Sequence, residues 1–383
     1  MQYDIAIIGG GMVGASFALA LQNTAFRIAL IDAAPTHTND HRLIALNKAS
    51  CDFFKNLNLW SELKNHAASI HEVHVSTRGS FGTTRLLAKE MHVDALGHVI
   101  PARDINHALY TALESSENID VLRGAKLTAL SQTNSDVDLA LLTESGQELI
   151  TAKIVMGADG TFSTTRELLD IPAETIDYHQ KALVTITDLN RDHHHIAYER
   201  FLSNGAIAML PLTDQRAATI WSGNEKQIDE LLALSDDDFL AMLQKTFGFR
   251  LGKLMKTHSR FSYPLKYVRV KNPIKNRVLL MGNAAHTVHP IAAQGLNLAL
   301  YEVDVLTRHF SRKSPDNLSL ENCPDFLTQQ KLSLTVSHRL TQLFSLDFFP
   351  LTVLRQMGMM GLDVCLPLKK RLGKRLLGQV KPI

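Results

Sequence analysis

The first thirty residues combine two apolar runs with a glycine-rich turn. Ile5 to Ile8 is a short apolar run, Gly9 to Gly14 is rich in glycine, and Ala15 to Gln22 is rich in alanine and leucine. A second apolar run follows at Arg27 to Ile31. This order predicts a strand, a tight turn, a helix and a second strand, which together open a doubly wound α/β sheet.

The pattern of apolar and polar positions changes in the middle of the chain. Alternating, β-branched residues at His71 to Ser76 and strand-like segments within His179 to Trp221 predict a second sheet, inserted into the first domain. Apolar strands followed by nucleotide-type turns return at Ile154 to Gly160 and at Val278 to Asn283. We therefore expect a first domain assembled from separated pieces of the chain, and mostly helical sequence after Leu320.

The turn at Gly9 to Gly14 fits the GxGxxG pattern of dinucleotide-binding folds. Its first glycine permits the tight turn, its second lets the backbone approach a pyrophosphate, and its third lets helix and strand pack closely. An acid at the end of the second strand accepts hydrogen bonds from the adenosine ribose, while the helix N-terminus faces the diphosphate. The motif leaves NAD and FAD as alternatives. The cofactor-binding candidates of this unit are Gly9, Gly11, Met12, Val13, Gly14 and Asp32.

Two later segments decide between these cofactors. They resemble the downstream motifs of the aromatic-ring hydroxylase flavoproteins: Met156 to Gly160 with Ser163 and Arg166, and Leu280 to His286 with Pro290, Gln294, Gly295 and Asn297. Shorter stretches are similar to the ubiquinone-biosynthesis branch of that family: Val73 to Gly82, Ala95 to Val99, Glu199 to Phe201, Met209 to Leu212 and the asparagine Asn283. Within the branch, the pattern is most similar to the hydroxylases of 2-polyprenyl-6-methoxyphenol, because related hydroxylases usually carry an aspartate at the position of Asn283.

The resemblance implies an α/β fold with three parts. These are a Rossmann-like FAD-binding domain of the para-hydroxybenzoate hydroxylase type, an inserted β-sheet substrate domain and C-terminal helices. The corresponding division is a discontinuous FAD-binding domain at 1–72, 97–176 and 270–325, a substrate-binding β-sheet domain at 73–96 and 177–269, and a C-terminal helical segment with a basic tail at 326–383.

The same resemblance implies a single-component, FAD-dependent aromatic monooxygenase. In the family, molecular oxygen adds to reduced flavin to give a C4a-hydroperoxide, whose distal oxygen is attacked by an electron-rich phenol ring. Because the sequence has no second GxGxxG, NAD(P)H is expected to bind transiently as a co-substrate. The implied substrate is a polyprenylated phenol of the 2-polyprenyl-6-methoxyphenol type in ubiquinone biosynthesis. The alternatives are a sister ring hydroxylase of that pathway, a flavin reductase or oxidase of the same fold, and a non-catalytic flavin-bound scaffold of a quinone-biosynthesis assembly.

Further cofactor contacts are implied residue by residue. Asp159 matches the family acid that lies near the diphosphate and helps the reductant to bind. Arg42 and Arg103 match arginines that contact the cofactor, and the amide of Asn283 can bond a ribityl hydroxyl. The other contacts lie in the late loop and at the start of the helix after it, where backbone amides favour the negative charge of reduced flavin; they are Pro290, Gly295, Leu296 and Asn297.

No single catalytic acid or base is implied, because the cofactor carries the difficult chemistry. His286 and His289 lie in the flavin loop, where an imidazole can assist phenol ionisation. A packing or hydrogen-bonding role is the alternative for both. Four positions depart from the family pattern: Ala293, Ala299, Glu302 and Lys331.

Composition and charge narrow the classes of partner. The formal net charge is +2, from 40 basic and 38 acidic residues, which gives no field strong enough to indicate nucleic acid. Three cysteines without a CxxC pair argue against a disulfide framework and a zinc ribbon. We expect no metal site, and we expect His193 to His195 to alternate between the two faces of a strand in a surface hairpin. With no recognisable signal peptide, these features favour a cytoplasmic protein.

The C-terminal region has an apolar segment followed by a basic tail. Phe344 to Leu366 is interrupted by charged residues and by Pro350, so no transmembrane helix is predicted. Lys369 to Lys381 is strongly basic. The segment can lie on an anionic membrane, at the periphery of the inner membrane, or can pack as ordinary C-terminal helices. Contact with other ubiquinone-biosynthesis proteins is a further expectation.

Overall fold

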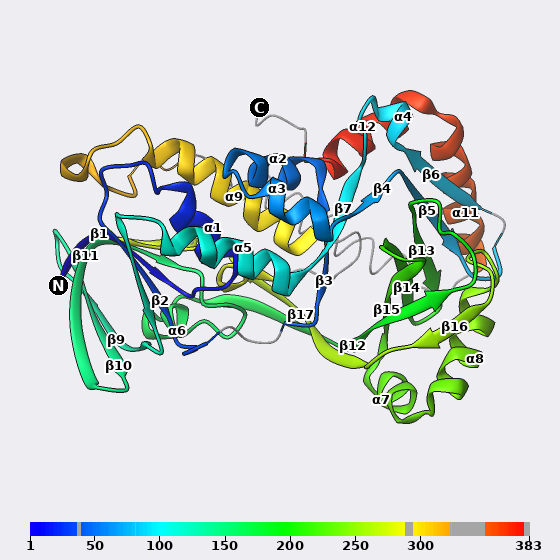
Figure 1. Ribbon diagram of the computed structural model, residues 1–383, viewed down its shortest axis with the longest axis horizontal. Helices are drawn as coiled ribbons and strands as arrows, with labels where there is room; N and C mark the ends of the chain where they lie inside the picture. Colours follow the sequence, from blue (N-terminus) through cyan, green and yellow to red (C-terminus); the bar gives the residue numbers. More distant parts are fainter. Residues whose placement is uncertain (37–39, 81, 288–293, 322, 324–348, 379–383) are drawn as a thin grey trace.

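The computed structural model describes residues 1–36, 40–80, 82–287, 294–321, 323 and 349–378 (Figure 1). Its first sheet has the strand order β18-β19-β11-β1-β2-β8, with β10 paired to β11 and β9 paired to β10. Strand β1 runs parallel to β11 and β2, and β8 and β19 extend the parallel part at either side. The bounds are β1 Gln2–Ile8, β2 Ile28–Asp32, β8 Ile119–Arg123, β9 Lys126–Gln132, β10 Val137–Thr143, β11 Gly146–Gly157, β18 Ile274–Lys275 and β19 Val278–Leu280.

Both faces of this sheet are buried, which explains why its strands are apolar throughout rather than alternating. One face packs against the helices α1 (Met12–Ala20), α5 (Ala102–Glu114) and α9 (Gln294–Phe310), in a core that includes Ile5, Ile28 and Phe310. The other face packs against the hairpin of β9 and β10, through residues such as Ala6 and Leu139. The doubly wound opening unit predicted from the sequence is therefore confirmed.

The second sheet, at the right of Figure 1, has the order β20-β17-β12-β15-β14-β13-β5-β6, with β16 paired to β12. Helices α7 (Glu225–Ala233) and α8 (Asp236–Phe247) cover one face of it, over a core around Trp221 and Phe239. The bounds are β5 Glu72–Thr77, β6 Thr83–Leu87, β12 Ala173–Leu189, β13 Ile196–Leu202, β14 Gly205–Leu212, β15 Arg216–Asn224, β16 Leu254–Thr257, β17 Phe261–Val270 and β20 His286–Thr287.

A small third sheet links the other two. It consists of β3 (Leu43–Asn47), β7 (Gly97–Pro101) and β4 (Ala68–Ile70), all antiparallel neighbours. Side chains of β3, β4 and β7 form one apolar cluster with residues of β13, β14 and β15. Short helices complete this region and the edges of the first sheet: α2 Lys48–Asn56, α3 Trp60–Leu63, α4 Ala88–Met91 and α6 Thr164–Leu168. The short turns η1 Lys64–His66, η2 Gly282–Ala284 and η4 Pro315–Asn317 are of the 3-10 type.

Two C-terminal helices pack on the second sheet. Helix α11 (Phe349–Val364) lies along β6, and α12 (Leu366–Leu376) lies against α4 (Figure 1). The expected α/β architecture, with an inserted β-sheet domain and C-terminal helices, is thus confirmed. We keep the three-part division of the chain as a proposal. It follows sheet membership except at β20, which lies in the 270–325 segment yet pairs with β17 of the second sheet, and at the ends of β5, β12 and β17, which cross the proposed boundaries.

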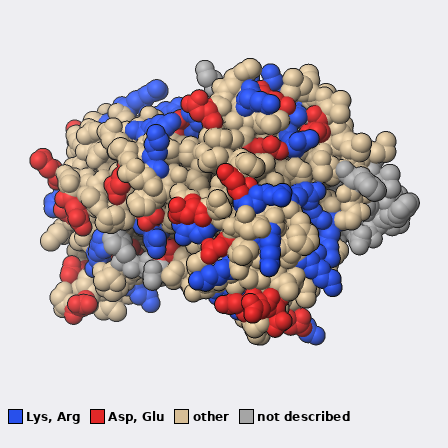
Figure 2. Space-filling view, turned by 45° about the vertical axis from the view of Figure 1, so that its right-hand side comes forward, with Lys and Arg blue, Asp and Glu red and all other residues tan. Residues whose placement is uncertain are grey.

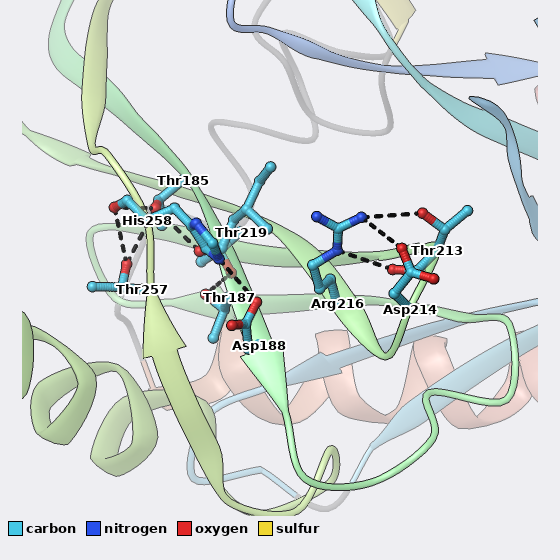
Figure 3. A network of polar contacts seen from close by, with 10 residues as sticks. Thr185, Thr187, Asp188, Thr213, Asp214, Arg216, Thr219, Thr257 and His258 are labelled. Carbon is cyan, nitrogen blue, oxygen red and sulfur yellow. Dashed lines mark hydrogen bonds and ion pairs between the residues drawn. The ribbon is translucent and has the colours of Figure 1, made fainter.

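Buried threonines join the strands on the α7 and α8 side of the second sheet (Figure 3). Thr187 and Thr219 share a hydrogen bond of 2.8 Å, and Thr185 and Thr257 share one of 3.1 Å. Because each hydroxyl finds a partner, these polar groups are buried without a desolvation penalty. They hold β12, β15 and β16 in register.

The expectation for the histidine run is wrong. His193 to His195 lie in a turn between β12 and β13, which are not paired with each other, and His194 and His195 have positive φ angles. The ring of His193 is buried and lies 2.7 Å from the carbonyl of Leu212. The backbone must reverse here to carry the chain between distant strands, so the alternation of faces in a strand does not apply. No group of three or more His, Cys, Asp or Glu side chains is placed to hold a metal in the described ranges.

Candidate active site

The glycine turn between β1 and α1 has three different surroundings. Gly9 has a φ of +105°, and a Cβ there would lie 2.5 Å from the carbonyl oxygen of Ala158. A Cβ on Gly14 would collide with the carbonyl oxygen of Gly9. A Cβ on Gly11 would meet nothing within 4 Å. Gly9 and Gly14 are therefore required by the fold, whereas the space over Gly11 is open.

That open space lies at the N-terminus of α1. Gly11 is the N-cap residue, no side chain caps the helix, and no acid lies in the first turn. Met12 is buried and Val13 is half-buried beneath the turn. Uncapped helix amides carry partial positive charge and favour a bound phosphate. The residues present fit the diphosphate of a dinucleotide such as FAD.

Asp32 at the end of β2 is held by a residue that the sequence analysis missed. The Tyr110 hydroxyl donates to the carbonyl oxygen of Gly10 at 2.8 Å and to Asp32 Oδ2 at 3.1 Å. The amide of Ala34 donates to Asp32 Oδ1 at 3.1 Å. Burial, together with the charge of Asp32, raises the pKa of Tyr110, so its hydroxyl stays a donor. Tyr110 lies far along the chain on α5, and no local signal connects it to the turn.

Asp159 lies directly beside the glycine turn. A Cβ on Gly9 would lie 2.8 Å from the Cα of Asp159. The Asp159 carboxylate accepts hydrogen bonds from Ser163 Oγ at 2.5 Å, from Thr165 N at 2.8 Å and from Thr165 Oγ1 at 2.9 Å. It therefore organises the start of α6. Its expected part in binding the reductant stays a prediction.

Asn283 lies near the same glycine turn, although it is about 270 positions away in sequence. Gly282 has a φ of +55°, and a Cβ there would lie 3.1 Å from a methyl group of Val13 in α1. This close approach carries η2 onto the start of α1 and leaves the side chain of Asn283 exposed. An exposed amide beside the glycine turn can donate to or accept from a sugar hydroxyl.

His286 is buried behind this loop rather than turned toward solvent. Its Nε2 lies 2.7 Å from Glu302 Oε1, and the two side chains are 1% and 0% exposed. Glu302 Oε2 also accepts a hydrogen bond from the amide of Gly282 at 3.1 Å. This geometry favours the packing and hydrogen-bonding role among the two alternatives for His286. His289 and Pro290 lie outside the described residues, as do Ala293 and Lys331.

The N-terminus of α9 carries the remaining predicted contacts. Gly295 and Leu296 are half-buried in its first turn. The side chain of Asn297 is buried and accepts from the amide of Asn47 at 2.9 Å, while its own amide donates to the carbonyl oxygen of Ala45 at 2.9 Å. Asn297 thus fixes β3 to the start of α9. The expected contacts of Gly295, Leu296 and Asn297 with the flavin stay predictions.

The two predicted arginines lie on the surface. Arg42 precedes β3 and holds Asp40 through Nε at 2.9 Å and Nη2 at 2.6 Å. Burial raises the pKa of Asp40, but the hydrogen bond and charge of Arg42 outweigh it, so the pKa is lowered overall and the pair is ionic. The side chain of Arg103, in the first turn of α5, is 71% exposed and lies 3.4 Å from Asp104. Their predicted contact with the cofactor stays a prediction.

Charge over the surface is mixed. Figure 2 shows basic and acidic side chains interspersed over the face in view, in keeping with the net charge of +2. The charged groups that matter for the site are the local ones around the glycine turn.

Comparisons with known proteins agree with this geometry. The family model for the FAD binding domain matches residues 2–312. Ubiquinone hydroxylase UbiL from Rhodospirillum rubrum is 30% identical over 99% of this chain and 90% of its own length. The 3-demethoxyubiquinol 3-hydroxylase of Escherichia coli is 28% identical over 98% of both chains.

Solved structures show the same fold. The p-nitrophenol 4-monooxygenase PnpA from Pseudomonas putida superposes with a TM-score of 0.78, at 15% identity, with both chains covered completely. Pseudomonas aeruginosa PqsL in complex with 2-aminobenzoylacetate superposes with a TM-score of 0.73, at 20% identity, over 99% of both chains. The assignment rests on the glycine turn before the uncapped helix α1, on the acid after β2 and on the similarity to hydroxylases over nearly the whole chain. The protein belongs to the FAD-binding-domain family and, within it, to the flavin-dependent aromatic-ring monooxygenases of the ubiquinone-biosynthesis branch.

Proposed function

We propose that the protein hydroxylates the ring of a polyprenylated phenol of the 2-polyprenyl-6-methoxyphenol type in ubiquinone biosynthesis, with NAD(P)H as electron donor. The observation that carries this proposal is the similarity over 99% of the chain to a relative named as a ubiquinone hydroxylase. The cytoplasm, with a peripheral position at the inner membrane, is the proposed location.

In this proposal the chain's own residues bind and orient. The open space over Gly11 and the uncapped amides of α1 hold the diphosphate of FAD, and Asp32, fixed by Tyr110, holds the adenosine ribose. Asn283 holds the chain between diphosphate and ring, and Arg42 and Arg103 supply further positive charge. FAD bound there would supply the redox chemistry, namely electron transfer from NAD(P)H and transfer of one oxygen atom of O2 to the phenol ring.

A sister hydroxylase of the same pathway is the second candidate. The Escherichia coli relative carries the name 3-demethoxyubiquinol 3-hydroxylase, which indicates a different substrate, a demethoxyubiquinol. Asn283 favours the first assignment, because related hydroxylases usually carry an aspartate there. The two candidates differ in the substrate that enters the site.

The experiment that separates these candidates identifies the quinone precursor that accumulates when the gene is removed. The proposal predicts a methoxyphenol that carries the isoprenoid chain. Accumulation of a demethoxyquinol would instead indicate that the protein is the sister hydroxylase. Purified protein given NAD(P)H, a short-chain prenyl methoxyphenol and labelled O2 should place label in the product, whereas release of peroxide alone indicates a reductase or oxidase. A non-catalytic scaffold would restore quinone synthesis even as a variant that cannot hold FAD.

We also propose that the C-terminal helices touch an anionic membrane. None of the helices in the described part of the chain has the length and hydropathy needed to cross a membrane. Instead, α11 and α12 expose large apolar side chains, with Met357 65% and Val364 84% exposed. Among the side chains that the structure describes in these two helices, the exposed large apolar ones are Met357, Met360, Val364, Leu366, Leu368 and Leu372.

The other side of the same helices is fixed to the protein. Thr84 Oγ1 donates to the carbonyl oxygen of Met359 at 2.8 Å, and the amide of Arg85 donates to Asp363 Oδ1 at 2.8 Å. Lys369 is buried and lies 3.2 Å from Glu90 Oε2. The exposed cations left beside the apolar face are Arg371, Lys374 and Arg375. An apolar face flanked by cations matches an anionic lipid surface, from which a polyprenyl substrate would arrive.

Vesicle sedimentation tests this contact. Wild-type protein should bind vesicles of phosphatidylcholine with phosphatidylglycerol more strongly than vesicles of phosphatidylcholine alone. Val364→Asp should weaken binding to both, and neutralising Arg371, Lys374 and Arg375 together should remove only the preference for the anionic lipid. Met242→Asp, an exposed methionine on α8, serves as the matched control. Equal binding by all variants would contradict the proposed membrane contact.

A further inference from the structure

A carboxyl group lies in the centre of an apolar row on the second sheet. Cross-strand pairing places Glu199 of β13 opposite Val75 of β5 on one side and opposite Ala208 of β14 on the other. The same register continues outward in both directions. In strand order, the row reads Thr84, Val75, Glu199, Ala208, Ile220, Val184 and Phe261. Paired residues point to the same face of a sheet, so Glu199 is the one ionisable side chain of this row.

The face that carries Glu199 is turned toward the FAD-binding part of the molecule. Ala197, two residues before Glu199 on the same strand and face, belongs to the apolar cluster that includes Val99 of β7 and Ala45 of β3. The carbonyl oxygen of Ala45 is the one bonded by Asn297 at the start of α9. On the opposite face, Tyr198 packs at 5.8 Å against the ring of Phe247 in α8.

The two faces differ in how completely they are covered. On the α8 side, Ile207, Met209 and Trp221 are at most 1% exposed. On the other side, Val75, Glu199, Ala208 and Ile220 are half-buried and keep some accessible surface, while Thr84 and Val184 are buried. Apolar side chains that keep accessible surface are the kind of surface that takes an apolar ligand. The ends of the row are bounded by Met359 of α11, bonded to Thr84, and by His41, stacked on Phe261.

Glu199 has the properties of a proton acceptor near neutral pH. Burial raises the pKa of its carboxyl to about 7, with no contribution from a neighbouring charge. None of the described residues donates a hydrogen bond to it. The ionisable groups that face the row lie at its margins. They are Asp363, Lys369 and Glu90 beyond Thr84, His41, Asp40, Arg42 and Tyr263 beside Phe261, and Asp188 and Arg216 at the strand ends. A half-buried carboxyl with apolar neighbours on both sides, to which no described residue donates a hydrogen bond, is suited to binding a hydroxyl from a ligand.

We infer that Glu199 binds the phenol hydroxyl of the substrate and takes its proton during ring hydroxylation. This inference rests on the proposed function. The phenol O–H bond breaks, the proton joins a carboxylate oxygen of Glu199, and the electron pair stays on the phenol oxygen, which makes the ring a stronger nucleophile. The proton returns when the product leaves as a neutral phenol. The apolar row on either side of Glu199 receives the ring and the first part of the isoprenoid chain.

The test measures the affinity of FAD-loaded protein for 2-prenyl-6-methoxyphenol, a one-isoprene analogue, as a function of pH. A carboxylate accepts a stronger hydrogen bond than a neutral carboxyl, so affinity should rise about tenfold as pH rises through about 7. In Glu199→Gln this pH dependence should vanish, and product formation should fall about a hundredfold relative to NAD(P)H oxidation. Glu199→Asp should keep a pH-dependent affinity, which makes the test independent of any loss in folding by the glutamine variant.

Glu174→Gln, the same change at an exposed position of β12, is the matched control and should behave as wild type. If Glu199→Gln keeps the wild-type pH dependence and product yield, the inference about Glu199 is wrong while the proposed function stands. If wild-type protein neither binds nor hydroxylates the analogue or its longer-chain forms, the proposed function itself fails.

Discussion

The side chain of Asn297 holds the backbone of Asn47 across 250 positions of sequence, accepting its amide hydrogen at 2.9 Å. Asn47 in turn caps α2, because its side chain accepts from the amide of Ser50. One pair of residues thus sets the positions of the start of α9, the end of β3 and the start of α2. The first turn of α9 and the strand after Arg42 are two of the segments expected to surround the flavin.

Asn297→Ala should destabilise the protein by about 1–3 kcal/mol, because it leaves the amide of Asn47 and the carbonyl of Ala45 without their partner. Urea unfolding of the FAD-free protein measures this. Asn204→Ala, in the exposed turn between β13 and β14, should change the free energy of unfolding by less than about 0.5 kcal/mol. Equal stability of the two variants would show that Asn297 does not fix β3.

Substitutions at Gly11 and Gly14 should separate cofactor binding from folding. Gly11→Thr adds a side chain to the open space and supplies a good N-cap, so folding should be kept while FAD affinity falls at least about tenfold. Gly14→Ala forces a methyl group into the carbonyl of Gly9 and should destabilise the FAD-free protein by about 1–3 kcal/mol. FAD titration and thermal unfolding of both variants check this. Undiminished FAD uptake by Gly11→Thr would contradict the proposal that the diphosphate binds at this turn.

Tyr110→Phe should loosen Asp32 without changing the packing of the ring. It removes the hydrogen bonds to the carbonyl of Gly10 and to Asp32, and keeps the aromatic face that lies 4.2 Å from the guanidinium of Arg123. We expect a loss of about 1 kcal/mol in unfolding free energy and weaker FAD binding. Isothermal titration with FAD measures the second effect. An unchanged affinity would mean that Asp32 is positioned by β2 and the amide of Ala34 alone.

His98 should make stability depend on pH in the acid range. Burial, reinforced by the charge of Lys55, lowers its pKa from 6.5 to about 4. Between these two values the unfolded chain binds a proton that the folded protein does not, so unfolding free energy should fall as the pH drops from about 6.5 to about 4. His98→Gln should flatten this part of the profile, measured by urea unfolding at several pH values. A variant profile as steep as wild type would assign the effect to other groups.

Cys51 and Cys365 should differ in reactivity. Burial raises the pKa of Cys51 to about 12, while Cys365 is exposed between α11 and α12. Because the thiolate is the nucleophile, iodoacetamide at neutral pH should modify Cys365 and leave Cys51 unmodified in the folded protein. Peptide mass spectrometry before and after unfolding checks the order. Early modification of Cys51 would contradict the buried position of α2.

The local pattern of the chain was sufficient to predict the opening strand, turn and helix, the acid after β2 and the return of apolar strands at β11 and β19. Each of these features is predicted from a short run of neighbouring residues. Within such a run, the hydrophobic periodicity and the positions of glycines determine the backbone conformation. The resemblance of motifs extended this to the family and to Asp159 and Asn283. It did not indicate that the carboxylate of Asp159 organises α6.

Tertiary structure alone decided which side chains meet. Tyr110 reaches Asp32 from α5, His286 is buried against Glu302, and the side chain of Asn297 bonds the backbone of β3. His193 to His195 form a turn because the chain passes from β12 to β13, a strand of the same sheet that does not pair with β12. The periodicity of a strand does not encode such a connection. Contacts between residues tens to hundreds of positions apart depend on crossovers and on sheet register, and these are set by burial of whole faces rather than by any local run of residues.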